Sequence, residues 1–388
     1  MTEGGVAGFP VIDLFAGAGG VSVAARHAGC DVRLGVDSDS VACRTLARNA
    51  DVHHGGAVLE ADVCTLDGAT LRDAAHLAPS DPLVIVGGPP CQPFSKAAFW
   101  SEDGDEAAYR RARSRGEHLE RPGAQSARPD ARRTLVGEFL RLIVEADADG
   151  FVFENVLSLA APRNRPILDA LIDGAKRAGY RTRFLRANAA DYGAPQRRER
   201  VFVLASKTAT PNAPEPTHSM SRQEQIGRLP AVSAGEAIGR FAGPEFHEPE
   251  EVVSGRWAEH LKTVPPGWNY KAHTAWGGHP NPTFVTETRY WNFLLKLHPD
   301  LPSWTIPASP GPWTGPFHWE SRRLRTPELA ALQGFPDGYE FEGSRRERVR
   351  QIGNAAPTQL VAPMIGSVVA AISRKSAEVG REVRACVA

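Results

Sequence analysis

Positions 11–20 carry the stretch that decides the fold, Val11-Ile12-Asp13-Leu14-Phe15-Ala16-Gly17-Ala18-Gly19-Gly20. Its apolar start predicts a buried strand, and the residues after Gly20 predict a helix. Glycines let a ligand approach the backbone closely, and the first turn of a helix offers free N–H groups. The spacing is not G-x-G-x-x-G, so taken alone the stretch fits a structural turn as well as a nucleotide-like ligand.

Short apolar runs alternate with amphipathic helical stretches through residues 10–205. Further strands are predicted at 32–36, 83–86, 151–153 and 201–204, and helices at 40–49 and 167–178. This alternation is typical of an α/β protein, with a mostly parallel sheet covered by helices on both faces. A chain of 388 residues is long for one domain, so we expect two lobes.

The pattern changes in two places. Residues 96–133 are polar and follow directly on a cysteine turn, which predicts a mobile active-site lid. The arginines of this predicted lid are Arg110, Arg111, Arg113, Arg115, Arg121, Arg128, Arg132 and Arg133.

From about Pro211 to Trp319 the alternation disappears, and seven of the eight tryptophans lie there. Such a segment fits a nucleic-acid-binding surface and the core of a small irregular domain equally well. Residues 352–371 predict a final helix that packs on the first lobe.

The bulk composition is typical of a globular protein, with 42% hydrophobic and 23% charged residues. Lys and Arg together number 45 and so do Asp and Glu, so nucleic-acid binding would need a local basic cleft. We expect a cytoplasmic location, because no signal-peptide pattern and no apolar run of membrane-spanning length is apparent. The cysteines are scattered without a C-x-x-C pair, which argues against a disulfide framework and a zinc site.

The turn Pro89-Pro90-Cys91-Gln92 follows the predicted strand 83–86 and the pair Gly87-Gly88. Two prolines fix their own φ angles and remove two backbone donors, so Cys91 is expected on a rigid platform. A thiol mounted in this way suits a nucleophile. A lone cysteine at a strand end is more often a buried core residue, and that alternative stays open at this point.

Carboxylates follow several of the predicted strands. Asp37 follows the strand 32–36, and Asp62 lies at about the next strand end; such acids can accept ribose hydroxyls or an adenine amino group. Glu154 follows the strand 151–153, where it could share or donate a proton. Each of these residues is better explained, on its own, as a helix cap or a turn residue.

A basic run, Gln196-Arg197-Arg198-Glu199-Arg200, precedes the predicted strand 201–204. Alternate side chains of an extended chain point the same way, so Arg198 and Arg200 are expected to converge. Two convergent guanidiniums can bind a phosphate and a carbonyl oxygen. A solvated ladder of salt bridges is the alternative.

Read in order, these motifs resemble the cytosine-5 DNA methyltransferase family of bacterial restriction-modification systems. The resemblance covers residues 13–20, Asp37, Asp62, Pro89 to Gln92, Glu154-Asn155-Val156, Gln196 to Arg200, Leu332 to Pro336 and Gln351 to Pro357. It implies a Rossmann-like methyltransferase core with a mostly parallel sheet, plus a smaller irregular target-recognition domain. The implied domains are a catalytic and cofactor-binding core at 8–206, the target-recognition domain at 207–320, and a segment at 321–380 that returns to the core.

The resemblance also implies a reaction and its residues. The Cys91 thiolate would add to carbon 6 of a flipped-out cytosine, Glu154 would protonate N3, and Arg200 would hold O2 with electrostatic help from Arg198. Carbon 5 would then take a methyl group from S-adenosyl-L-methionine. The implied cofactor-binding residues are Phe15, Ala16, Gly17, Gly19, Gly20, Asp37, Ser38, Asp62, Val63, Pro89, Asn354 and Ala355. The implied DNA-binding residues are Gln92, Ser95, Arg132 and Gln196, and no metal is implied.

Some residues depart from the family's pattern, and other functions remain as alternatives. Ser38 stands where many members carry a bulky residue, and the predicted lid is longer than the family's shortest. An RNA cytosine-5 methyltransferase of the same fold is the nearest alternative, although a second lobe of more than a hundred residues suits a duplex major groove. A non-catalytic DNA-binding regulator and an NAD-dependent oxidoreductase are less favoured. We expect a monomer that binds double-stranded DNA, with a cognate restriction endonuclease as a further candidate partner.

Overall fold

The computed structural model describes residues 8–51, 55–90, 94, 133–221, 226–285 and 291–386, with 374–386 as backbone alone. The predicted site residues Cys91, Gln92, Ser95 and Arg132 lie outside this part of the chain, as does the predicted lid except for Arg133. The chain divides into two compact units. Unit 1 comprises Met1–Ala187, Glu199–Pro214 and Val361–Ala388, and unit 2 comprises Asn188–Arg198 and Glu215–Leu360.

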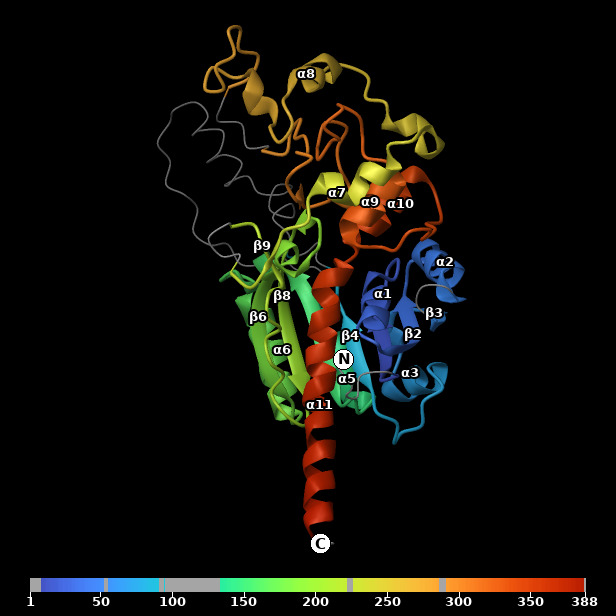
Figure 1. Ribbon diagram of the computed structural model, residues 1–388. Helices are drawn as coiled ribbons and strands as arrows, with labels where there is room; N and C mark the ends of the chain where they lie inside the picture. The colour runs from blue at the N-terminus through green and yellow to red at the C-terminus, as the bar shows by residue number, and fades with distance from the viewer. Residues whose placement is uncertain are drawn as a thin grey trace. The chain divides into compact units, whose positions relative to one another are not determined.

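Unit 1 is an α/β unit built on a seven-stranded sheet (Figure 1). The strands follow the order β3-β2-β1-β4-β5-β8-β6. Their bounds are β1 Pro10–Leu14, β2 Asp31–Asp37, β3 Ala57–Glu60, β4 Val84–Gly87, β5 Gly150–Val156, β6 Arg181–Asn188 and β8 Glu199–Ser206. The helices are α1 Gly20–His27, α2 Ser40–Arg48, α3 Gly68–Ala74, α5 Leu135–Glu145, α6 Arg165–Arg177 and α11 Thr358–Cys386, of which unit 1 takes the part from Val361. The fold class predicted from the sequence is thus confirmed.

The strand register brings the ends of four strands into one row. Leu14 of β1 lies opposite Val36 of β2 and Gly87 of β4, and Gly87 lies opposite Phe153 of β5. These strands are parallel, so the residues one position further along each strand stand at the same edge of the sheet. The four following residues are Phe15, Asp37, Gly88 and Glu154. Ligand sites of open α/β sheets lie at this carboxyl edge.

Strand β8 is antiparallel to β5, and this places its first residues at the same edge. Glu154 lies opposite Phe202, and Val156 lies opposite Arg200. The basic run that precedes β8 in the sequence therefore enters the sheet beside the carboxyl end of β5. This reversal is what brings Arg200 to the row of strand ends.

Apolar side chains cover both faces of the sheet. On one face the Phe139 ring of α5 packs edge-on against Phe151, with centroids 5.8 Å apart, and also contacts Phe153. On the other face lies α11, which crosses the sheet in Figure 1. Gly150 has no room for a side chain there, because a Cβ atom would stand 2.7 Å from Val368 of α11. Burial on both faces explains why these strands read as continuous apolar runs.

Unit 2 has few regular elements. They are β7 Gln196–Arg197, β9 His218–Ser219, β10 Leu229–Pro230, α7 Ala234–Ile238, α8 Ala258–Thr263, β11 Ser303–Trp304, α9 Thr326–Gln333 and α10 Arg345–Asn354. Its tryptophans are divided between the core and the surface. Trp257 and Trp313 pack against a core that includes Tyr270, whereas Trp268 and Trp276 are 45% and 65% exposed.

Buried ion pairs hold the stretch after residue 320 within unit 2. Arg325 pairs with Glu251, and Arg322 binds both carboxylate oxygens of Glu328, at 2.8 and 2.6 Å. Residues 321–360 therefore belong to unit 2 and not to a segment that returns to the core, and the chain rejoins unit 1 only at Val361. The assignment of 207–320 to target recognition stays a prediction.

The predicted single helix over 352–371 is wrong, because the chain forms two helices there. Helix α10 ends at Asn354 and α11 begins at Thr358. Pro357 has no N–H to donate, and it forces the residue before it out of the helical conformation. Ala355 has already turned to φ −59° and ψ 148°.

The helical region after residue 345 is more apolar than expected from the sequence, in which no run of membrane-spanning length was apparent. Within the described residues, Arg345–Ser373 contains a window with a mean hydropathy of 1.5, which is long and apolar enough to cross a membrane. In this protein 56% of that window is buried in the interior, as in the core helix of a globular fold.

Candidate active site

The glycine-rich turn after β1 bends sharply at the carboxyl edge of the sheet. Phe15, Gly17 and Gly19 all have positive φ angles, of 60°, 54° and 84°. Gly19 is the N-cap of α1, and no side chain in the described part of the protein caps that helix. A Cβ atom added to Gly17 would meet no described atom within 4 Å. The turn therefore presents bare backbone and uncapped N–H groups to open space, as a site for a polar ligand does.

The carboxylate of Asp37 is fixed against this turn. One of its oxygens accepts a hydrogen bond from the Gly17 N–H at 2.8 Å, and the other accepts one from the Asp39 N–H at 2.8 Å. Burial raises the pKa of Asp37, and the two N–H donors act against that rise. Each oxygen keeps a second lone pair, so the carboxylate can still accept hydroxyl groups.

Other predicted cofactor residues have less distinctive surroundings. The side chain of Asp62 caps the turn that begins at Val63, accepting from the Cys64 N–H at 2.9 Å. This is the capping role that the sequence left open as the alternative. Val63 is buried and Ser38 is exposed. In unit 2, Asn354 is exposed and Ala355 is half-buried.

Asp13 is a buried acid for which the sequence prediction assigned no role. It is 0% exposed on β1, and its Oδ2 accepts a hydrogen bond from the Ser22 hydroxyl at 2.7 Å. Its Oδ1 has no hydrogen-bond partner among the described residues. Burial, as the largest cause, raises the pKa of Asp13 from 3.8 to about 7. Its one visible signal in the sequence was an acid inside an apolar strand.

Asp13 predicts a pH dependence of stability. Between about pH 4 and pH 7 the unfolded chain ionises this group while the folded protein keeps it protonated, so the free energy of unfolding falls as the pH rises. The full loss is roughly 4 kcal/mol, reached above pH 7. Asp13→Asn should have nearly the same free energy of unfolding at pH 5 and pH 8, as measured by urea titration, whereas wild type should be less stable at pH 8. Equal slopes in the two proteins would contradict the assignment.

Glu154 and Arg200 form an ion pair at the carboxyl edge. Arg200 Nε lies 2.6 Å from Glu154 Oε1, and the two side chains are only 9% and 13% exposed. Arg200 Nη1 also donates to the Glu199 carbonyl at 2.8 Å. A Cβ atom at Gly88 would stand 2.9 Å from Glu154 Oε2, so the carboxylate occupies the space above Gly88. The Gly87-Gly88 pair is thus explained by the close approach of Glu154 and of the β1 backbone.

The segment after Glu154 anchors the turn that leads to Cys91. Asn155 is 1% exposed, and its amide donates to the Pro89 carbonyl at 3.0 Å. The Ser158 hydroxyl donates to the Phe94 carbonyl, and Phe94 is fully buried in the core. Both flanks of residues 91–93 are therefore fastened to the strand end that carries Glu154. Nothing in the sequence indicated these anchoring roles.

Arg198 and Arg200 do not act as the convergent pair that the sequence predicted. Arg198 belongs to unit 2 and is 3% exposed. It donates to the carbonyl of Ile306 at 3.2 Å and to that of Gly353 at 2.9 Å. The extended pattern is interrupted at Arg198, between β7 and β8, so the two side chains take different partners.

Gln196 also has a structural role in place of the predicted DNA contact. It is 0% exposed. Its amide nitrogen donates to Leu332 O at 3.0 Å and to the Gln333 side chain at 2.7 Å, and its oxygen accepts from the Ile306 N–H. These contacts leave the side chain no surface on which to meet DNA.

A model of the family described as C-5 cytosine-specific DNA methylase matches residues 9–109 and 121–370. The chain belongs to this family. It is a DNA cytosine-5 methyltransferase of the bacterial restriction-modification type, as the resemblance in its motifs implied. The family and the fold together imply S-adenosylmethionine as the methyl donor.

Curated relatives are named as type II methyltransferases, and a solved structure shares the fold. The type II methyltransferase M.SacI of Streptomyces achromogenes is 38% identical over 90% of each chain. M.NgoFVII of Neisseria gonorrhoeae is 29% identical, over 92% of this chain and 86% of its own. A solved structure of a candidate DNA modification methyltransferase encoded within an E. coli prophage aligns with a TM-score of 0.63 at 20% identity. That alignment covers 94% of this chain and all of the other and supports the fold.

The residues at the carboxyl edge fit S-adenosylmethionine. The open space beside Gly17 accepts a ligand against the backbone. The uncapped start of α1 suits a carboxylate, and the fixed Asp37 suits hydroxyl groups. The buried Asp13 oxygen without a partner among the described residues is a further polar atom beside this turn.

Proposed function

We propose that this enzyme methylates one short duplex DNA sequence, and that Cys91 forms a covalent bond to a flipped-out cytosine. The proposal rests on the Arg200–Glu154 ion pair at the carboxyl edge. The segment that carries Glu154 also holds Pro89 and Phe94, which flank residues 91–93. Gly88 lies against the Glu154 carboxylate and is three residues from Cys91. Chain length alone therefore keeps the Cα atoms of Gly88 and Cys91 within about 11 Å of each other.

The other cysteines with described side chains are poor nucleophiles. Burial raises the pKa of Cys30 to about 11 and that of Cys43 to about 12. The pKa of Cys64 is also raised, by desolvation and then by Asp62. These thiols stay protonated at neutral pH, whereas the attacking species must be a thiolate. Cys91, in its proline turn, is the residue to which the proposal assigns the attack.

Glu154 and Arg200 would hold the base during this attack. The Cys91 sulfur bonds to carbon 6 of cytosine, and the electron pair of the 5,6 double bond moves toward the ring nitrogen N3. Glu154 would supply a proton at N3 and so neutralise the charge that develops there. The second terminal nitrogen of Arg200, which no described group engages, can donate to O2 while Nε keeps Glu154 in place.

Methyl transfer and release complete the sequence of bonds. Bound S-adenosylmethionine supplies the methyl group that carbon 5 takes up. A base then removes the carbon-5 proton, the 5,6 double bond reforms, and Cys91 leaves as a thiolate. N3 returns its proton to Glu154, so that the product is neutral 5-methylcytosine. For the cofactor, Asp37 would accept the ribose hydroxyls and the Gly17–Gly19 turn would lie against the methionine part. The base is reachable only outside the helix stack, so flipping costs a few kcal/mol.

The proposal extends to partners and place of action. A methyltransferase of a type II system acts beside an endonuclease that reads the same sequence, and we propose such an endonuclease as its partner. Both would work in the compartment that holds the bacterial chromosome. We propose the irregular part of unit 2, 215–320, as the part that reads the DNA sequence.

Bisulfite sequencing tests the function directly. The purified protein is incubated with S-adenosylmethionine and unmethylated bacterial DNA, and methylated cytosines are mapped. We expect methylation of one cytosine within a single short recurring sequence. In a preparation that binds the cofactor, methylation of transfer RNA alone would overturn the DNA assignment in favour of the RNA alternative. Scattered methylation without a common sequence would overturn the proposed specificity.

A further inference from the structure

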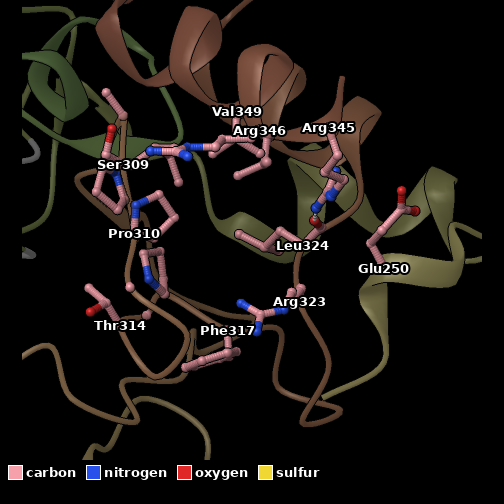
Figure 2. A pocket seen from close by; sticks show the side chains of 17 residues that line it. Glu250, Ser309, Pro310, Thr314, Phe317, Arg323, Leu324, Arg345, Arg346 and Val349 are labelled. Atoms are coloured by element: carbon pink, nitrogen blue, oxygen red, sulfur yellow. Dashed lines mark hydrogen bonds between the residues drawn. The ribbon is translucent and has the colours of Figure 1, made fainter. Parts of the chain in front are cut away.

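Unit 2 contains a cavity of about 500 Å³ that none of the predicted site residues lines. Figure 2 shows it between the loop 306–317, the start of α9 and the helix α10. Its walls combine apolar side chains with arginines. The apolar part of the wall includes Pro310, Phe317, Leu324 and Val349.

Two of the three arginines at the cavity have no carboxylate partner among the described residues. Arg345 is neutralised by Glu248, at 2.6 Å, and also bonds to Thr326. Arg323 has one side-chain hydrogen bond, from Nη2 to the Pro312 carbonyl at 3.2 Å. Arg346 is exposed on α10 and makes no ion pair within the described part of the chain. In Figure 2 the side chains of Arg323 and Arg346 approach the cavity from two different walls.

Arg323 is half-buried and has no carboxylate partner among the described residues. The pKa of Arg323 is lowered by desolvation and then by Arg345. The guanidinium lies 6.0 Å from the centre of the Phe317 ring, which provides only a weak cation–π contact. Glu250 is the one acid that lines the cavity, and it is exposed. An arginine in this position binds phosphate oxygens well, because its donors form a fixed planar fork.

The cavity is preformed, because buried residues behind its wall hold Ile306 and Ala308 in place. The buried Arg198 and Gln196 bind the carbonyl and the N–H of Ile306, each at 3.2 Å. Gly353 packs so closely that a Cβ atom there would stand 2.5 Å from the Ala308 backbone. A ligand that enters such a cavity orders little of the protein, and binding is stronger for that reason.

We propose that this cavity binds a phosphate group carried on a sugar. Arg323 and Arg346 hold the phosphate oxygens, and the sugar lies against the apolar wall of Phe317 and Pro310. Two sources supply this chemistry, a DNA strand and a free nucleotide. DNA is favoured, because it is the substrate of this enzyme family and presents a phosphate on every sugar. The cavity then anchors the DNA backbone outside the site of methyl transfer.

The first arm of the test measures DNA binding against salt concentration. The variant is Arg323→Gln/Arg346→Gln. The matched control is Arg177→Gln/Arg181→Gln, which removes two exposed charges from unit 1, at the end of α6 and the start of β6. The variant should weaken duplex binding at least about tenfold and reduce the slope of log K against log salt by about 1. Its KM for DNA should rise while kcat changes little. The control should keep the wild-type slope.

The second arm identifies the source of the phosphate. Deoxycytidine monophosphate and inorganic phosphate are titrated by calorimetry into wild type and variant without DNA. If the variant loses nucleotide binding but keeps the wild-type slope of log K for DNA against log salt, the cavity binds a free nucleotide. If the variant keeps both the wild-type salt slope for DNA and the wild-type affinity for the nucleotide, the proposal is overturned. Retained cofactor binding and retained kcat separate that outcome from a failure of the proposed methyl transfer, and thermal unfolding shows that the variant is folded.

Discussion

Replacing Cys91 with alanine is expected to abolish methyl transfer while duplex binding persists. Alanine has no sulfur to bond to carbon 6, so carbon 5 never becomes nucleophilic enough to take the methyl group. Loss of the attacking group in an enzyme of this kind costs about 10⁴-fold or more in kcat. The measurement is transfer of a labelled methyl group to DNA, paired with a binding assay on the same preparation.

Cys30→Ala is the matched control for this prediction. Cys30 is buried at the start of β2, away from the carboxyl edge, and its raised pKa keeps it protonated. The control should transfer methyl groups at the wild-type rate. Turnover by Cys91→Ala above the background of a boiled sample would show that another group attacks the base. A covalent complex of wild-type protein with DNA containing 5-fluorocytosine, absent in Cys91→Ala, would identify the bond directly.

Replacing Glu154 with glutamine is expected to lower kcat by about 10²–10⁴-fold, the range for a general acid. Glutamine keeps the shape of the side chain but cannot give a proton to N3. It also leaves the guanidinium of Arg200 without its counter-charge at a site where both side chains are nearly buried. The variant should therefore also be less stable, and single-turnover kinetics at a temperature well below its unfolding transition separate the two effects.

Asp169→Asn provides the comparison for a broken ion pair. Arg165 and Asp169 are 2.7 Å apart on α6, and both side chains are 46% exposed. Exposed pairs contribute about 0–1 kcal/mol, so this variant should keep both its stability and its kcat. If Glu154→Gln lost stability and kept its wild-type kcat, Glu154 would be a structural partner of Arg200 and not the proton donor.

The arrangement of the core could be predicted from the sequence because its signals are local. The apolar run before Gly17 and the glycines after it specify a strand, a turn and a helix whatever the rest of the chain does. The runs at 83–86 and 151–153 are apolar at every position because helices cover both faces of the sheet. Parallel strands place their ends at one edge, so the proximity of Asp37 and Glu154 to the glycine turn follows from the strand order.

The partners of the polar side chains could not be predicted, because they come from distant parts of the chain. Arg198 and Arg200 look equivalent in the sequence. The acceptors of Arg198 lie 108 and 155 residues away in unit 2, whereas Arg200 meets Glu154 across two antiparallel strands. Gln196 likewise reads as a surface residue until the structure shows its amide bound to α9.

The sequence by itself therefore determined the fold, the family and the residue types that carry the chemistry. The tertiary structure alone decided which of those residues face a substrate and which hold the protein together. It showed that Asn155 and Ser158 fasten the flanks of the Cys91 turn, and that Arg323 stands at a cavity with no counter-charge among the described residues. The physical reason is that backbone conformation responds to neighbours in sequence. The partner of a buried polar group is set by whichever distant segment the packing brings within 3 Å or so.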